Sequence, residues 1–339
     1  MKITNPTNTQ IALELCKNNP NSSYSTLLGY DKETGSITND LSLFLAQPEI
    51  ANEFISDMSN KIIVQRAYDL FEGYEMPFKV FMRTMSKLGD AEELLSSKLA
   101  TPKDYDGTNK NPFNASKPSI VLSWIKTTDK KVVDVSLSYE IWSGAFLSAD
   151  GLSNIASIIL KNLRDSIEEY IREKISEDLV DSAKITKKHT ITTIAASGET
   201  ANAQKAYEDI LKLARDMSIP STDYNESGVK TFTGLGKAVL ILNTRYASSF
   251  DVNVLASLFN SGEIATKKYF TEVIATALPT GTENTVGVIL DKDAYMWGNR
   301  IDIAQSINNP ATLEINTYYH RWIKRAFVPF KQAVRLVTA

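Results

Sequence analysis

One long run of regularly spaced apolar residues constrains this chain more than any other feature of its sequence. From residue 152 to 179 an apolar side chain recurs every three or four positions, at Leu152, Ile155, Ile159, Leu163, Ile167, Ile171, Ile175 and Leu179. This spacing predicts one amphipathic α-helix about 40 Å long, at ~1.5 Å per residue. Opposite charges four positions apart, such as Lys161 and Asp165, indicate a solvated second face. We therefore expect a fold built along a spine helix at about residues 150–180, and not a coiled coil, which needs longer heptad repeats.

The composition is typical of a globular protein and excludes several classes of function. The 339 residues are 43% hydrophobic and carry a net charge of −3, which argues against a protein whose main task is to bind phosphate groups. The single cysteine, Cys16, cannot form an internal disulfide, and we expect it to be buried. The N-terminus lacks the apolar segment of a secretory signal, and the longest apolar run, Ala238–Leu242, is too short to span a bilayer. We therefore expect the chain to remain in an aqueous compartment.

The first half of the chain predicts a polar arm, a helix and a long excursion. Residues 1–40 are rich in Asn, Thr, Ser and Gly, which favours an extended arm with at most one short helix near Gln10–Lys17. The further elements expected are a helix at about 47–60, a strand over Pro77–Met85, a capped helix over Asp90–Leu99, a polar loop over 102–119, and strands over Ile120–Ile125 and Val132–Tyr139. The excursion, roughly 67–140, has too few apolar residues to form a domain of its own.

The second half alternates helical and β-type patterns, so the sequence predicts an α+β fold. The elements expected are a β-type segment over Thr190–Ile194, a helix over Ala203–Met217, a helical turn over Val254–Phe259, and strands over Ala238–Asn243, Phe270–Thr276 and Thr285–Leu290. We also expect Tyr295–Trp297 to pair with the last of these strands across a turn at Asp291–Asp293.

Two short motifs resemble ligand-binding sites but lack the residues that such sites require. Thr233–Lys237 is similar to part of a phosphate-binding loop, but Lys237 is followed by Ala238 where that loop needs Ser or Thr, so we interpret it as a turn. Asp291 and Asp293 could hold Mg²⁺, but no third ligand follows, and a polar turn is the simpler interpretation. The sequence therefore predicts no metal or cofactor site.

The remaining candidates for chemistry are two histidines and one acidic run. His189 and His320 are the only general bases of the usual type, and we interpret His320 as a core or interface residue. The acidic run Glu173–Asp181 has no metal-ligand spacing and is interpreted as a solvated helix end. We expect no catalytic residues. An α/β enzyme that uses Asp291, Asp293 and His320 remains a less favoured alternative.

Three segments in the last third of the chain resemble one family of proteins. Asp251–Asn260 reads DVNVLASLFN, Val286–Trp297 reads VGVILDKDAYMW, and Asn316–Ile323 reads NTYYHRWI. In order and spacing these segments resemble the major capsid protein of the small phi-29-like podoviruses, a group of tailed bacteriophages. Residues Gln47–Met58 and the spine helix match the same proteins more loosely, so the resemblance covers about residues 45–339.

The resemblance implies an α+β fold of the Hong Kong 97 capsid type. The division implied is an N-terminal arm (1–45), the start of the P-domain (46–66), an E-loop (67–140), more P-domain with the spine helix (141–200), an A-domain (201–305) and closing P-domain strands (306–339). Better-known members add a C-terminal immunoglobulin-like domain, whereas this chain ends at Ala339, so we expect no such domain.

The same resemblance implies a structural protein of the virion. By this analogy the chain assembles into hexamers and pentamers of an icosahedral shell around double-stranded DNA, in the host cytoplasm, with a scaffolding protein and a portal as partners. Because the E-loop would lie over the adjacent subunit, we expect inter-subunit contacts at Phe78, Phe81, Phe113 and Trp124. An encapsulin-type shell that encloses protein cargo shares the fold and remains the nearest alternative.

Overall fold

The computed structural model describes residues 7–64, 78–85, 91–97, 120–193, 200–250, 269–282, 284–309, 311–312 and 314–338. The chain divides into two compact units. Unit 1 contains residues 1–76, 129–170 and 301–322, and unit 2 contains residues 77–128, 171–300 and 323–339. Helix α6 and strands β2, β7 and β8 contribute residues to both units.

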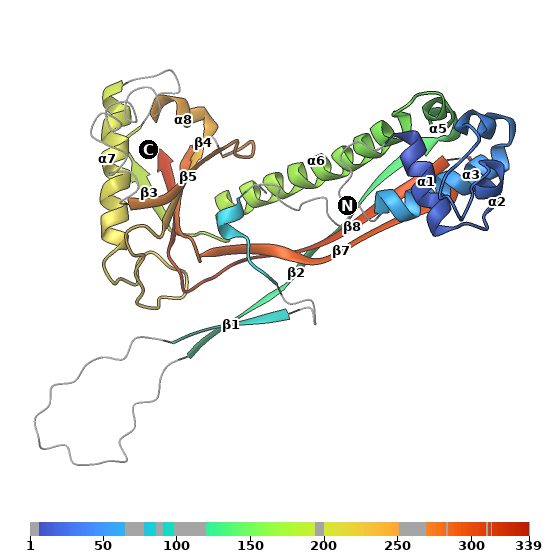
Figure 1. The fold of residues 1–339 in the computed structure, drawn as a ribbon. Coiled ribbons are helices and arrows are strands. Elements are labelled where there is room, and N and C mark those ends of the chain that lie inside the picture. Colours follow the sequence, from blue (N-terminus) through green and yellow to red (C-terminus); the bar gives the residue numbers. More distant parts are fainter. Residues whose placement is uncertain are drawn as a thin grey trace, which may run out of the picture. The chain divides into compact units, whose positions relative to one another are not determined.

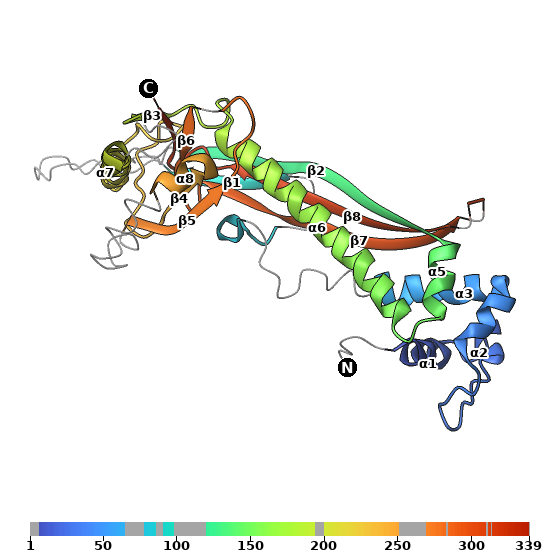
Figure 2. The same cartoon turned by 90° about the horizontal axis from the view of Figure 1, so that it is seen from above.

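Unit 1 contains a group of short helices. Its members are α1 (Asn8–Asn18), α2 (Ser23–Leu27), the 3₁₀ helix η1 (Leu41–Ala46), α3 (Pro48–Met58), the π-helical turn η2 (Ser59–Ile63) and α5 (Tyr139–Phe146). Both views show α1, α2, α3 and α5 close together (Figures 1 and 2). Polar side chains define where the first of these helices begin, α1, α2 and η1. Thr7 and Gln10 form a capping box at α1, and Asp40 accepts a hydrogen bond from the Ser42 amide at the start of η1.

Four aromatic rings form the core of this helical group. Phe54 of α3 lies 5.5 Å from Tyr24, 4.8 Å from Phe44 and 5.9 Å from Phe146, measured between ring centroids. Ile11, Leu15 and Cys16 of α1 are buried as well. The helix expected near Gln10–Lys17 is confirmed as α1, but the expectation of an otherwise extended arm was wrong. The polar composition concealed a second helix, α2, because a few well-spaced apolar residues are enough to pack a short helix against a neighbour.

The predicted spine helix is confirmed as α6 (Gly151–Val180). Its apolar stripe is buried over almost its whole length, at Leu152, Ile159, Leu163, Ile167, Ile171, Ile175 and Leu179. Asn8 fixes the start of the helix within unit 1: its side-chain oxygen accepts from the Leu152 amide at 3.0 Å, and its amide group donates to the Ala145 carbonyl at 2.8 Å. Despite its length, α6 is not apolar enough to cross a membrane, and neither is any other helix in the described part of the chain.

A four-stranded sheet has the order β1-β2-β8-β7. Its strands are β1 (Ala91–Ser97), β2 (Ile120–Ser138), β8 (Glu314–Phe327) and β7 (Tyr295–Asn309). The two strands expected between residues 120 and 139 form the single strand β2. Two expectations for the excursion were wrong: the helix expected over Asp90–Leu99 is replaced by strand β1, and the strand expected over Pro77–Met85 by the 3₁₀ turn η3 (Lys79–Phe81). The expected 102–119 loop lies outside the described residues.

A five-stranded mixed sheet in unit 2 has the order β3-β9-β6-β4-β5. Its strands are β3 (Lys188–Ile191), β9 (Ala333–Thr338), β6 (Thr285–Asp291), β4 (Ala238–Asn243) and β5 (Phe270–Thr276). The β3–β9 and β4–β5 pairs are parallel, and the other two pairs are antiparallel. Apolar residues of α7 (Thr200–Met217) and α8 (Thr244–Phe250) pack with those of the sheet in one core.

The structure corrects one pairing and confirms several elements near this sheet. The helix over Ala203–Met217 and the strands β4, β5 and β6 are confirmed. Tyr295–Trp297 does not pair with β6, because it begins β7 of the other sheet, while β6 lies between β9 and β4. The helical turn expected over Val254–Phe259 lies outside the described residues.

Candidate inter-subunit surface

Strands β1 and β2 form an antiparallel hairpin within unit 2. The register pairs Glu93 with Trp124, Leu95 with Leu122 and Ser97 with Ile120. In a strand, side chains alternate between two faces, and the exposure along β1 alternates in this way from Ala91 to Ser97. The hairpin therefore presents two distinct faces.

One face of the hairpin is covered and the other is exposed. On the covered face, Leu94 and Val121 pack against a small apolar cluster formed by Val229, Val328 and Phe330. On the other face, four large apolar side chains are exposed: Leu95 by 62%, Ile120 by 64%, Leu122 by 47% and Trp124 by 55%. Exposed apolar side chains gathered on one surface are typical of a protein-binding site. We call these four residues the hairpin face.

An ion pair between a buried lysine and a partly exposed glutamate favours one position of the hairpin. The Lys324 side chain on β8 is fully buried, and its Nζ lies 3.2 Å from Oε1 of Glu92 on β1. Strand β2 lies between these two strands in the sheet, so the lysine reaches across β2. Because a buried ammonium group is strongly destabilising without a compensating charge, this pair favours one position of β1.

The segment before the hairpin is held tightly against β7. The Trp297 indole N–H donates to the Phe78 carbonyl at 3.0 Å, and the Arg83 amide donates to the Trp297 carbonyl at 2.8 Å. Phe78 has a φ of 54°, a left-handed conformation that is rare for residues other than glycine. At position 298 only glycine fits, since a Cβ there would lie 2.2 Å from the Arg83 carbonyl oxygen. The base of the hairpin is therefore a closely packed part of unit 2.

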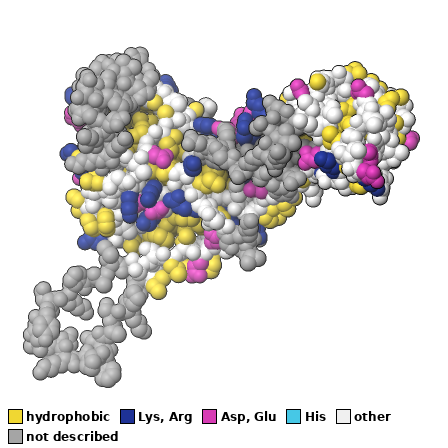
Figure 3. Space-filling model, viewed as in Figure 1, with side chains coloured by type: hydrophobic (Ala, Val, Ile, Leu, Met, Phe, Trp, Pro, Cys, Tyr) yellow, Lys and Arg dark blue, Asp and Glu magenta, His cyan; other side chains and the backbone are white. Residues whose placement is uncertain are grey.

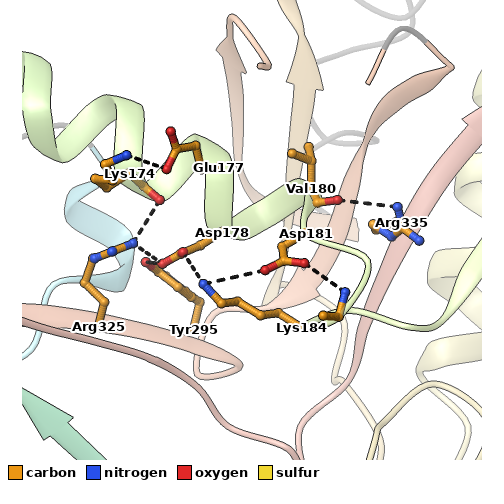
Figure 4. Close-up of polar contacts among 10 residues, drawn as sticks. Lys174, Glu177, Asp178, Val180, Asp181, Lys184, Tyr295, Arg325 and Arg335 are labelled. Atoms are coloured by element: carbon orange, nitrogen blue, oxygen red, sulfur yellow. Dashed lines mark hydrogen bonds and ion pairs between the residues drawn. The ribbon is translucent and has the colours of Figure 1, made fainter. Parts of the chain in front are cut away.

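A buried carboxylate near the end of α6 accepts hydrogen bonds from three donors (Figure 4). Asp178, only 6% exposed, accepts from the Tyr295 hydroxyl at 2.7 Å and from Lys184 Nζ at 2.5 Å. The Arg325 guanidinium donates to the same carboxylate, and also to the Lys174 carbonyl at 2.9 Å. Burial, together with the Asp178 charge, raises the pKa of Tyr295 well above its usual value. This cluster ties α6 to β7 and β8 within unit 2.

The Asp178 cluster corrects the interpretation of residues 173–181 as a solvated helix end. Asp178 follows Ile175 by three positions and directly precedes Leu179, so it lies on the apolar stripe of the helix. This position among apolar residues is the sequence feature from which the burial of Asp178 could have been predicted. Its partners could not be inferred from local patterns, because Tyr295 and Arg325 lie 117 and 147 residues further along the chain.

The four predicted contact residues differ in their surroundings. Trp124 belongs to the exposed hairpin face. Phe78 and Phe81 are buried within unit 2, where the Phe81 ring lies 5.7 Å from that of Tyr295 and little of either side chain is left for a neighbouring subunit. Phe113 lies outside the described residues. Contact of these residues with another subunit stays a prediction.

The residues considered for an enzyme do not gather in one unit. Asp291 and Asp293 belong to unit 2, where the Asp291 carboxylate accepts from the Asp293 amide at 2.9 Å in a turn and Asp293 pairs with Arg83 at 2.8 Å. His320 belongs to unit 1 and lies on β8. Across the described ranges, no group of three or more His, Cys, Asp or Glu side chains is placed to hold a metal ion.

Comparison with known proteins shows the family of this chain. A family model described as "Phi29-like phage major capsid protein" matches residues 18–337. The chain belongs to this family. It is 25% identical over 289 residues to the major capsid protein of Bacillus phage PZA, a match that covers 82% of this chain and 62% of that protein. It is 23% identical over 306 residues to the major capsid protein of Bacillus phage B103, covering 87% and 65%.

Solved structures confirm the fold implied by this phi29-like family. A chain from the capsid structure of Staphylococcus phage Andhra superposes with a TM-score of 0.56 at 12% identity, covering 74% of this chain and 81% of that chain. The α+β fold of the Hong Kong 97 capsid type is therefore confirmed, and the family match favours a phage capsid protein over an encapsulin. The chain spans less than two thirds of the length of the curated relatives described above.

Proposed function

We propose that this chain is the structural subunit of an icosahedral phage capsid, in which it forms hexamers and pentamers around double-stranded DNA. Membership of the phi29-like major capsid protein family supports the proposal. The single structural observation that carries it is the hairpin face, four large apolar side chains on a pair of strands whose other side is already packed. A surface of this kind requires a partner, and in a homogeneous shell the partner is another copy of the chain.

The strength of such a contact suits assembly. Burial of the exposed parts of these four side chains would remove roughly a few hundred Å² of apolar surface from water, and each Å² contributes about 25 cal/mol. This buried area is smaller than the ~800 Å² that each partner buries in a stable pair of proteins. Each contact is therefore weak, and a shell gains its stability from many contacts repeated by symmetry.

The remaining parts of the proposal follow the family. We propose that residues 67–140, which include the hairpin, act as the E-loop, that 201–305 form the A-domain, and that the other segments form the P-domain and the N-terminal arm. A scaffolding protein and a portal would be partners, and packaged DNA would meet the shell through weak, non-specific contacts. Assembly would take place in the host cytoplasm and the product would be the virion capsid.

A matched pair of variants tests the hairpin face. Trp124 and Phe232 are exposed to the same extent, 55% and 56%, and both belong to unit 2. We expect Trp124→Glu to abolish particles in negative-stain electron microscopy, because it places a charge in an apolar contact, while Phe232→Glu leaves them intact. Normal particles from Trp124→Glu would show that the hairpin face is not an assembly contact.

A further inference from the structure

One end of the five-stranded sheet in unit 2 carries a lysine at each of four neighbouring strands. The strand order places β3, β9, β6 and β4 side by side. The lysines at the ends of these strands are, in the same order, Lys188, Lys331, Lys292 and Lys237. Lys188 and Lys237 are exposed, and the other two are half-buried. We call these four residues the lysine end.

Backbone contacts show that the four lysines share one end of the sheet. The Lys292 amide donates to the Lys237 carbonyl at 3.0 Å, and the Asp291 amide donates to the Gln332 carbonyl, next to Lys331, at 3.0 Å. Strand β3 runs parallel to β9, and both begin at this end. Because neighbouring strands lie ~4.8 Å apart, the row of four extends over about 14 Å.

Carboxylates do not neutralise this row. Among the described residues, none of the four lysines forms an ion pair with an aspartate or a glutamate. Asp293 pairs with Arg83 at 2.8 Å, and Glu226 accepts from the Thr186 amide at 2.7 Å and from its hydroxyl at 2.6 Å. The ammonium groups of the lysine end are therefore available to an anionic partner.

The segments around the lysine end are basic as well. Residues 184–192, 228–243 and 329–338 contain seven Lys and Arg and no Asp or Glu. Unit 2 as a whole contains 27 Lys and Arg against 21 Asp and Glu, a net charge of +6, although the chain has a net charge of −3. On the face shown in Figure 3, Lys and Arg side chains gather beside hydrophobic ones in the part that carries α7. The net charge of the chain therefore conceals a basic unit.

The Thr233–Lys237 segment, which resembles part of a phosphate-binding loop, leads into the lysine end. The Lys237 amide donates to the Gly234 carbonyl at 2.9 Å, and Gly236 has a φ of 79°, so the interpretation as a turn is confirmed. The turn holds Lys237 at the start of β4 with its side chain exposed.

We propose that the lysine end binds the phosphate backbone of double-stranded DNA. The proposal rests on the proposed function of the chain as a shell subunit, and it names the surface through which each copy meets the enclosed DNA. Lysine binds phosphate as a point charge, without the planar fork by which arginine selects one geometry. Contacts to phosphate fix position without reading base sequence, so binding at this surface is independent of sequence.

Duplex DNA fits this surface better than an acidic protein segment does. DNA carries one negative charge per ~1.7 Å of its axis, so a row of lysines about 14 Å long meets several phosphates wherever the duplex is placed. A protein partner would instead need carboxylates spaced to match four strands.

The salt dependence of DNA binding tests the proposal. Four lysine–phosphate contacts predict a slope of about −3.6 for log K against log salt, so raising NaCl from about 0.05 to about 0.2 M should weaken binding by about 150-fold. Lys237→Gln, Lys292→Gln and Lys331→Gln combined should reduce this factor to about 3.5-fold, because one contact remains. Fluorescence anisotropy with a short labelled duplex, at chain concentrations too low for assembly, measures both.

The matched control removes three exposed lysines of unit 2 that lie outside the lysine end. It combines Lys126→Gln on β2 with Lys205→Gln and Lys212→Gln on α7. The control has the same net charge as the test variant, so an effect of overall charge would appear equally in both. We expect the control to keep nearly the full salt dependence of the unaltered chain.

A single substitution provides a second measurement that keeps all four lysines. Phe232 is 56% exposed and follows Thr231, whose carbonyl accepts from the Gln332 side chain at 3.0 Å, so it lies close to Lys331. Phe232→Glu introduces a carboxylate there and should weaken DNA binding by about tenfold at about 0.05 M NaCl, while particles still form.

The possible results separate this inference from the proposed function. If the unaltered chain forms no particles, the proposed function fails. If particles form but the test variant and the control bind DNA with equal affinity and slope, only this inference is overturned. A test variant that binds DNA like the unaltered chain but forms no particles would assign the lysine end to a protein contact, and would overturn the inference as well.

Discussion

Tyr24 shows how one buried hydroxyl organises the polar contacts of the helical group. Its hydroxyl donates to Asp57 Oδ2 at 2.8 Å, and the same carboxylate oxygen accepts from Asn19 at 2.5 Å and from Lys61 at 3.3 Å. Burial, with smaller contributions from Asp57, raises the pKa of Tyr24 to about 12, from 10.0. The folded chain therefore favours the protonated phenol more strongly than the unfolded chain does.

This raised pKa predicts a loss of stability in alkali. Below pH 10 the phenol is protonated in both states, so its contribution to stability is fully present. Between pH 10 and about 12 the unfolded chain loses the proton first, and the free energy of unfolding falls by up to about 1.4 kcal/mol per pH unit. Tyr24→Phe should lower stability by about 1 kcal/mol at neutral pH and flatten this alkaline loss. Urea denaturation at several pH values measures both effects, and equal slopes in the two proteins would contradict the explanation.

Loss of a partner of the buried Asp178 carboxylate should destabilise the chain much more than loss of the exposed ion pair at the neighbouring Glu177. Arg325→Ala removes one of its cationic partners and should lower the free energy of unfolding by about 3 kcal/mol. Glu177→Gln breaks the more exposed pair with Lys174 and should lower it by less than about 1 kcal/mol. Urea denaturation followed by tryptophan fluorescence compares the two variants. Similar losses would mean that the Asp178 cluster is not the stabilising contact described.

At the level of elements, the sequence predicts those whose apolar spacing follows one clear period. Helices α3, α6 and α7 and strands β4 to β6 were found by this rule. Residues Ala91–Ser97 form a strand and not the expected helix for a physical reason. Asp90 and Glu93 are suitable capping residues, but pairing with β2, more than twenty residues away, outweighs local preference. Pairing with strands distant in the sequence also explains why Tyr295 begins a strand of the other sheet, which local patterns did not predict.

The close approach of the 78–85 segment to β7 gives a test at this level. In Gly298→Ala the new Cβ would meet the Arg83 carbonyl oxygen at 2.2 Å, so the segment must move, with a loss of about 1–3 kcal/mol. Gly144→Ala is the matched control, because nothing lies within 4 Å of the added atom and alanine favours the helix. Thermal denaturation should show a lower melting temperature only for Gly298→Ala. A similar decrease in both variants would argue against the close contact.

At the level of the whole molecule, the sequence reveals the family and the fold more readily than the contact surface. Trp124 was expected at a contact because of the resemblance; the structure places it on the exposed hairpin face, and its contact with another subunit stays a prediction. The burial of Phe78 and Phe81 could not be predicted from the sequence, because it depends on Tyr295 and Trp297, over 200 residues away.

The central claim is that many copies of this chain form a closed shell, and cryo-electron microscopy of the purified chain tests it most directly. The chain should be expressed alone and together with a scaffolding partner. The account predicts closed icosahedral particles composed of pentamers and hexamers, with the hairpin of each copy in contact with a neighbour. A chain that stays strictly monomeric under all of these conditions would contradict it.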